Sequence, residues 1–182
     1  MNFWQTLKQH KKPFFVVAPM ADVTDAAFRQ LVVTYGKPDV VWTEFVSANG
    51  LMSPGREVLA RDLMYTDAER PIVAQLFSAD PIQMQKAAQY VAELGFDGID
   101  INMGCPDKTI EKQGAGAAMI KTPEIARDII RAVKQGIVDA GKDIPVSVKT
   151  RVGYSDVQLD WIRTLLTQDI AALTVHVRTR KE

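Results

Sequence analysis

Six short apolar runs, most of them rich in β-branched side chains, alternate with segments of helical periodicity along the 182-residue chain. The runs are Phe14–Ala18, Val40–Phe45, Ile72–Phe77, Gly98–Asn102, Pro145–Lys149 and Ala172–Val177. A helix between two strands returns the chain to the same end of the sheet, so successive strands pair in parallel. The pattern therefore predicts an α/β fold with a parallel sheet and helices packed outside it.

Several residues between the runs mark helix starts. Asp80 and Thr122 each stand directly before a proline, the arrangement of a capping side chain followed by proline at the first helical position. Thr24 and Ser155 are expected to open two further helices. These signals support a regular alternation of strand and helix.

Such alternation is typical of a TIM barrel, in which eight strands close on themselves. The sequence contains only six runs, so we expect an incomplete (β/α)8 barrel that lacks strands seven and eight. We expect residues 1–182 to form a single, partial barrel domain. An open sheet leaves strand edges unpaired. We expect further chain, a partner or self-association to cover the open edge.

The composition excludes several classes of protein. Twenty-two basic and twenty-two acidic side chains cancel, so the net charge gives no argument for binding nucleic acid or membrane, although a local basic face remains compatible with it. One cysteine forms neither an internal disulfide nor a zinc cluster, and we expect no metal site. No apolar segment approaches the ~20 residues of a transmembrane helix. These features predict a cytoplasmic protein outside the membrane.

The only cysteine follows the fourth run, in the sequence Gly98-Ile-Asp-Ile-Asn-Met-Gly-Cys-Pro106. Folds with parallel strands place their chemistry at the carboxyl ends of those strands. Asn102 lies three residues before the cysteine and offers amide donors and an acceptor to a ligand. A lone cysteine is most often a small buried apolar side chain, but the strand-end position favours a catalytic role for Cys105.

Other runs carry polar side chains that would meet Cys105 at one end of a barrel. The pyrimidine edge of a flavin presents carbonyls and an N–H that suit a carboxamide such as Gln75. A lysine would stabilise the anionic reduced flavin, and Lys149 is placed for that role. Backbone N–H groups around Met20 suit flavin N5. The flavin phosphate usually binds after strands seven and eight, for which we find no runs.

Plainer interpretations exist for several of these residues. Lys149 could be a solvated strand terminus, and His176 a core histidine with satisfied hydrogen bonds. A buried Gln75 must find partners, which the backbone could supply as well as a ligand. Residues 114–116 indicate a flexible turn before a helix, and residues 178–181 a solvated run of charges.

Taken together, these motifs resemble those of the tRNA-dihydrouridine synthase family. The matching segments appear in the family's order and extend from about Phe14 to Glu182. They are Ala18-Pro-Met-Ala-Asp-Val-Thr-Asp25, Gln75, Asn102-Met-Gly-Cys-Pro106, Lys112-Gln-Gly-Ala-Gly-Ala117, Val148-Lys-Thr-Arg151 and His176-Val-Arg-Thr179. The cysteine motif with its downstream glycines is the most specific of them. Val177 departs from the pattern, since the family usually has a small residue after the histidine.

The resemblance implies an FMN enzyme that uses NADPH or NADH to reduce the C5–C6 bond of particular uridines in tRNA. Hydride would pass from the reduced flavin to C6, and Cys105 would protonate C5 from the opposite face. This role requires the neutral thiol, and so a thiol pKa near or above its ordinary value of ~8.5.

The resemblance also assigns residues to the cofactor and the substrate. The flavin contacts would be Pro19, Met20, Gln75, Lys149 and His176. Asn102 would lie beside both the flavin and the uracil. Arg178, with Lys108 or Arg151, would meet the RNA, whose target base must leave its stack to be reached.

Family members also have two more barrel strands, which grip the flavin phosphate, and a C-terminal helical domain that helps to hold tRNA. We identify neither here and therefore expect this chain alone to bind FMN weakly. An alternative is a truncated, catalytically weak or inactive family member that acts at most as an RNA-binding or interaction module. Dihydroorotate dehydrogenases and old-yellow-type enzymes use flavin on the same barrel but lack this cysteine turn.

Overall fold

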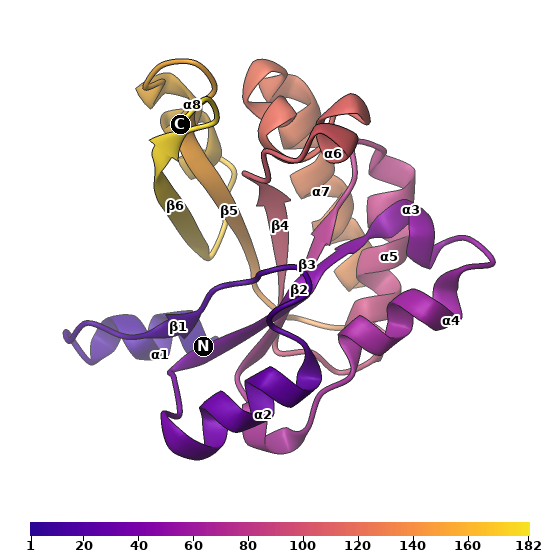
Figure 1. The fold of residues 1–182 in the computed structure, drawn as a ribbon, viewed down its shortest axis with the longest axis vertical. Helices are drawn as coiled ribbons and strands as arrows, with labels where there is room; N and C mark the ends of the chain where they lie inside the picture. The colour runs from indigo at the N-terminus through magenta and orange to yellow at the C-terminus, as the bar shows by residue number, and fades with distance from the viewer.

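A computed structural model describes residues 1–182 and contains one sheet of six strands. Each strand is parallel to its neighbours, and their order across the sheet is their order in the sequence. The strands are β1 (Val16–Val17), β2 (Val40–Ser47), β3 (Ile72–Phe77), β4 (Gly98–Met103), β5 (Val146–Gly153) and β6 (Ala172–Thr179). Figure 1 shows the sheet curving between β1 and β6, with helices on its outer side.

Eleven helical segments connect or flank these strands. The α-helices are α1 (Phe3–Gln9), α2 (Ala26–Tyr35), α3 (Ala48–Leu51), α4 (Arg56–Leu59), α5 (Pro81–Glu93), α6 (Lys108–Lys112), α7 (Pro123–Asp139) and α8 (Leu159–Leu166). Three 3-10 helices are η1 (Ala60–Leu63), η2 (Asp67–Glu69) and η3 (Gly116–Lys121). Sequential parallel strands with helical crossovers are the arrangement of a TIM barrel, here as an open half-barrel whose edges are β1 and β6. The predicted fold class is confirmed.

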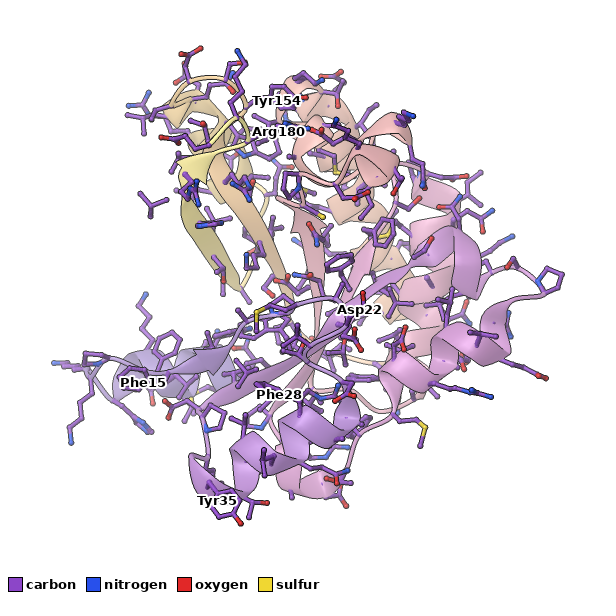
Figure 2. All side chains as sticks on the ribbon, in the orientation of Figure 1. Phe15, Asp22, Phe28, Tyr35, Tyr154 and Arg180 are labelled. Carbon is purple, nitrogen blue, oxygen red and sulfur yellow. The ribbon has the colours of Figure 1, made fainter.

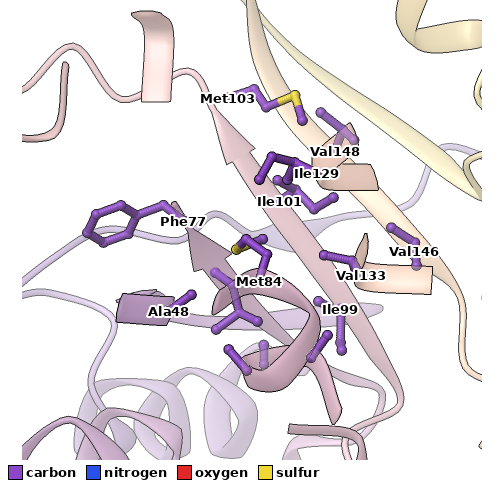
Figure 3. Close-up of a cluster of buried hydrophobic side chains, with 14 of the residues drawn as sticks. Ala48, Phe77, Met84, Ile99, Ile101, Met103, Ile129, Val133, Val146 and Val148 are labelled. Atoms are coloured by element: carbon purple, nitrogen blue, oxygen red, sulfur yellow. The ribbon is translucent and has the colours of Figure 1, made fainter. Parts of the chain in front are cut away.

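The main core lies between the sheet and the layer of α5 and α7. Alternate residues of β4 and β5, among them Ile101 and Val148, point outward and are buried against Met84 of α5 and Ile129 of α7 (Figure 3). The two helices pack closely because α7 has a glycine at their contact. A Cβ built on Gly136 would lie 2.1 Å from a backbone oxygen of α5. This face of the sheet is therefore committed to packing, and the other face remains for function.

The amino ends of the strands are covered by α1, which the sequence analysis did not predict. Asn2 and Gln5 form a capping box at its start. Its Trp4 is buried in a small cluster with Val40, Trp42 and Val73 at that end of the sheet. The two indole rings of this cluster lie 5.7 Å apart. Because α1 fills this end, the opposite end holds the open face of the half-barrel.

Some local predictions were confirmed and others were wrong. Asp80 caps α5 through the N–H groups of its first turn, as expected. Thr122 precedes Pro123 at the start of α7 but makes no capping hydrogen bond. Ser155 does not open α8, which begins at Leu159, because the preceding segment turns back onto β5 through a bond from Gln158 N to Val152 O.

The first predicted strand is much shorter than its apolar run. Only Val16 and Val17 pair with β2, although the run extends from Phe14 to Ala18. This strand has a neighbour on one side only, so fewer of its backbone groups are fixed by pairing. Among the helices, none combines the length and apolarity that a transmembrane span requires.

Candidate active site at the carboxyl ends of the strands

Strand register assembles polar side chains on the inner face of the half-barrel. Gln75 of β3 is level with Asp100 of β4, which is level with Ser147 of β5. One step further toward the carboxyl ends, Asn102 is level with Lys149. Because side chains alternate between the faces of a strand, Asp100 and Asn102 point to the same side. The inner face therefore changes from apolar beside α1 to polar above it.

Hydrogen bonds join this polar layer into one chain. Gln75 Nε2 donates to Asp100 Oδ2 at 2.6 Å, and Asn102 Nδ2 donates to Gln75 Oε1 at 3.1 Å. Ser147 Oγ donates to the other oxygen of Asp100 at 2.5 Å. All four side chains are buried. The sequence analysis named Gln75 and Asn102 but missed Asp100 and Ser147, which lie in runs that we interpreted as apolar.

The turn that carries Cys105 is held from several sides. Asn102 Oδ1 accepts from the backbone N–H groups of Gly104 and Cys105, at 3.1 and 2.9 Å. The Cys105 carbonyl accepts from Ala117 N at 2.9 Å. Gly116 allows this approach, since a Cβ there would lie 2.6 Å from the Cys105 oxygen. The predicted turn at residues 114–116 does lead into a helix, η3, but Ala115 and Gly116 are buried against the cysteine turn, which the prediction of a flexible turn did not anticipate.

Most of the predicted site residues surround one cavity of about 160 Å³ at the carboxyl ends of the strands. Those that line it are Pro19, Gln75, Asn102, Cys105, Lys149 and His176. The thiol and the lysine, from different strands, thus face one space. Met20 and Arg178 are not among the lining residues. Both side chains are exposed, and Arg178 bonds to the backbone of Glu182.

Burial and neighbouring charges set the protonation of the cavity. Burial raises the pKa of the Cys105 thiol, and a hydrogen bond from the backbone N–H of Asp107 partly offsets this increase. Burial lowers the pKa of Lys149, and the nearby Asp100 opposes that change. Burial and the cations Arg151 and Lys149 lower the pKa of His176. At neutral pH these directions keep the thiol protonated and favour a neutral imidazole.

Two arginines tie the cysteine turn to the end of β6. Arg151 donates from Nε to Gly104 O and from a terminal nitrogen to Thr179 O, both at 2.9 Å. Arg180 pairs with Glu111 of α6 at 2.5 Å and stacks on Tyr154, beside which it lies in Figure 2. The sequence analysis interpreted Arg180 as solvated, and this was wrong. Its partner lies 69 residues away, beyond any local signal.

The cavity suits the ring system of a flavin. The buried carboxamides of Gln75 and Asn102 each keep one amide hydrogen free of the hydrogen bonds described above, and Lys149 adds an ammonium group. Such donors match the carbonyl edge and the negative charge of a reduced isoalloxazine. A larger hollow of about 520 Å³ lies at the amino ends of β5 and β6, beside α1 and α7. It is remote from the cysteine turn.

An open parallel α/β half-barrel with a cavity at the carboxyl ends of its strands, lined by a thiol, an amine and two carboxamides, places the chain in the class of TIM-barrel-type proteins. The chain belongs to the dihydrouridine synthase (Dus) family, whose family model matches residues 16–182.

Curated relatives agree with this assignment over the whole chain. It is 44% identical over 184 residues to a "Probable tRNA-dihydrouridine synthase 2" of Bacillus subtilis (strain 168), covering 100% of this chain and 54% of the relative. A "Probable tRNA-dihydrouridine synthase" of Staphylococcus aureus (strain COL) is 41% identical, with 100% and 53% covered. The chain thus spans about half the length of the curated relatives that it matches.

Solved structures support the fold alone. A 2,3-dimethylmalate lyase of the PEP mutase/isocitrate lyase superfamily superimposes with a TM-score of 0.58 at 14% identity, covering 97% of this chain and 62% of that chain. A variant of NCR from Zymomonas mobilis gives a TM-score of 0.58 at 15% identity, with 92% and 65% covered.

Proposed function

We propose that this chain carries the flavin-binding and catalytic face of a tRNA-dihydrouridine synthase, an oxidoreductase that reduces the C5–C6 bond of uridine in tRNA. The observation that supports this most is the shared cavity, in which the half-buried Cys105 and the ammonium of Lys149 meet the two buried carboxamides. Family membership supports the same reaction. FMN is the proposed cofactor, and NADPH or NADH the proposed reductant.

The residues have distinct proposed roles. Gln75 and Lys149 bind the polar edge of the flavin ring, which would supply the hydride for C6. Pro19 and His176 bound the same space, and Met20 contributes through its backbone. Asn102 orients the ring and the uracil while it caps the cysteine turn.

Cys105 holds the proton that C5 requires. A general acid must be protonated before it acts, and burial raises the pKa of this thiol. The base has to leave its stack to reach a cavity at the strand ends. Arg178 on the exposed tip of β6 is proposed to contact the RNA backbone there.

Substitution of Cys105 by alanine tests the proposed acid. The variant is expected to lose dihydrouridine formation by at least about 100-fold, since a positioned acid contributes ~10²–10⁴-fold. Oxidation of NADPH by the flavin needs no proton from Cys105 and is expected to continue at an unchanged rate. The assay supplies FMN in excess and follows dihydrouridine in unmodified tRNA and flavin absorbance in parallel. Loss of both activities would show that the acid role is misassigned.

A second candidate, favoured by the unpaired edge strand β6 and its exposed His176, is an RNA-binding or interaction module without activity. Turnover by the 182-residue chain itself would exclude this candidate, whereas tRNA binding without flavin binding or turnover would support it. A cytoplasmic location is also our proposal, supported by a single cysteine with no disulfide partner.

A further inference from the structure

The polar chain beneath the cavity has a fixed direction. At one end, two backbone N–H groups of the cysteine turn require an acceptor, so Asn102 must present its oxygen to them. The NH₂ group of Asn102 then faces Gln75, whose side-chain oxygen must accept this hydrogen bond. The NH₂ group of Gln75 consequently points away from Asn102, to the place where Asp100 lies. Each amide is oriented by its neighbour.

Asp100 ends this chain with a group that accepts hydrogen bonds and donates none. An ionised carboxylate has no hydrogen to offer, so it holds only one orientation of the Gln75 amide. Ser147 bonds to its second oxygen, and Lys149 lies close enough to favour its charge. The Trp42 indole is also near this carboxylate, and its nitrogen is buried without a hydrogen-bond partner. Every neighbour named here is a donor or a cation.

We infer that Asp100 is a positioning residue, which fixes the amide direction of Gln75 and Asn102 and thereby holds the turn that carries Cys105. The inference deepens the proposed function, because these amides and this thiol are the groups assigned there to flavin and uracil. Asp100 itself is fully buried and is not among the cavity-lining residues, so it acts only through its neighbours.

The test reverses the amide chain instead of breaking it. In Asn102→Asp, the new carboxylate still accepts hydrogen bonds from the backbone of the cysteine turn. It offers no hydrogen to Gln75 Oε1, however, and the two oxygens repel each other. Asp100 prevents the Gln75 amide from rotating to relieve this contact. We expect Cys105 to react about tenfold faster with a neutral maleimide, the factor that corresponds to ~1.4 kcal/mol and to the loss of one buried hydrogen bond. Adding Asp100→Asn supplies a donor to the Gln75 oxygen, so the amide can rotate and donate to the carboxylate introduced by N102D.

The double variant N102D/D100N is therefore expected to react with maleimide more slowly than N102D, at close to the wild-type rate. Its midpoint of unfolding in urea is expected to return to that of the wild type. A charge-matched control is N102D/D100L, which removes the same negative charge but offers no N–H group. Removing Asp100 frees the Gln75 amide to rotate here too, but its oxygen then has no donor, so N102D/D100L is expected to stay clearly more reactive than N102D/D100N. All rates are measured on the full chain without flavin, where Cys105 is the only thiol.

Three results would overturn the inference. These are an N102D protein with the labelling rate and stability of the wild type, rescue by D100L equal to that by D100N, and failure of N102D/D100N to fold. If N102D alone does not fold, recovery of cooperative unfolding by D100N and not by D100L would be the supporting result. Because neither FMN nor tRNA is used, these outcomes are independent of the C105A experiment.

Discussion

At the scale of single residues, burial on the inner face of the sheet accounts for the unusual protonation of the site. Asp100 and Cys105 both lose hydration, and both are shifted toward their neutral forms. The consequences differ. The thiol gains the state that an acid requires, whereas the carboxylate is kept near its charged form at neutral pH by the donors around it.

The cost of burying Asp100 predicts a specific pH dependence of stability. Burial raises its pKa to about 6, against about 3.9 for an exposed aspartate. The folded protein therefore binds this proton more tightly than the unfolded chain, and its contribution to stability is lost as the pH rises through about 6. We expect the free energy of unfolding of the wild type, minus that of Asp100→Asn, to decrease by about 2 kcal/mol between about pH 4 and pH 7.

Urea titrations of both proteins at several pH values measure this difference. Other carboxylates, such as Glu111 and Asp139, have lowered pKa values, so their contribution to the stability of the folded protein is lost in acid. They are present in both proteins and cancel in the difference. A flat difference would mean that Asp100 titrates like an exposed carboxylate, and a difference that grows with pH would mean that folding lowers its pKa; either result would contradict the prediction.

Residues with a local signature were found from the sequence, and those defined by distant partners were missed. The Cys105 turn and Gln75 were identified, because a polar residue in or after an apolar strand is visible in the sequence. Asp100, between Ile99 and Ile101, carries the same local signal but was passed over, and its role became clear only from its register with Gln75 and Ser147. Arg180 was misread for the same reason, since Glu111 approaches it only in the fold.

At the scale of elements, the segment between β4 and α7 supports the site through close backbone contact. It contains α6 and η3, and η3 begins at Gly116 with φ +61°. A side chain at this position is strained by the dihedral and also meets the Cys105 carbonyl. At Gly116 a side chain would therefore incur both the strain of the left-handed backbone and a steric clash with the Cys105 carbonyl.

Gly116→Ala and Gly141→Ala separate these penalties. Gly141, after α7, has nearly the same dihedral, φ +65°, but a Cβ there meets nothing within 4 Å. We expect G141A to cost about 1 kcal/mol, the penalty of the left-handed conformation, and to leave Cys105 unchanged. G116A is expected to cost at least about 2 kcal/mol more, since backbone must move, and to accelerate maleimide labelling. Equal effects of the two changes on stability and labelling would contradict a packed cysteine turn.

Element types were predicted better than element limits. Alternation and apolar runs depend on local sequence, so six parallel strands and the helices between them were anticipated. Limits depend on tertiary contacts. The run that contains β1 pairs over only two residues, and α8 starts after a turn onto β5. The helix α1 was missed because the burial of its Trp4 depends on packing against Trp42, a contact that the sequence does not reveal.

At the scale of the whole molecule, the two faces and two ends of the sheet have different tasks. The outer face is filled by α5 and α7, and the amino ends are covered by α1. The inner face at the carboxyl ends is polar and carries the cavity. What the sheet lacks is closure, since β1 and β6 each have an unpaired side. The curated relatives that the chain matches are about twice as long.

This open sheet predicts how the 182-residue chain behaves by itself. Val177 of the edge strand β6 is 81% exposed, and a flat apolar edge promotes pairing between molecules. We expect the mass measured by light scattering to rise with protein concentration. Val177→Lys is expected to reduce that rise, because a charged side chain on an edge strand opposes pairing. Tyr35→Lys is the matched control and should change nothing, since Tyr35 is 84% exposed at the end of α2, away from β6 (Figures 1 and 2).

The same open edge should weaken the cofactor site, because His176 stands on the edge strand and is exposed. A flavin bound there would be enclosed on one side only, and most small-molecule sites bury 70–90% of their ligand. We therefore expect FMN to be lost when the 182-residue chain passes through gel filtration. A chain extended to the length of its relatives should retain it. Stoichiometric yellow flavin in a monomer of the 182-residue chain would contradict this, and it would mean that the half-barrel alone encloses the ring.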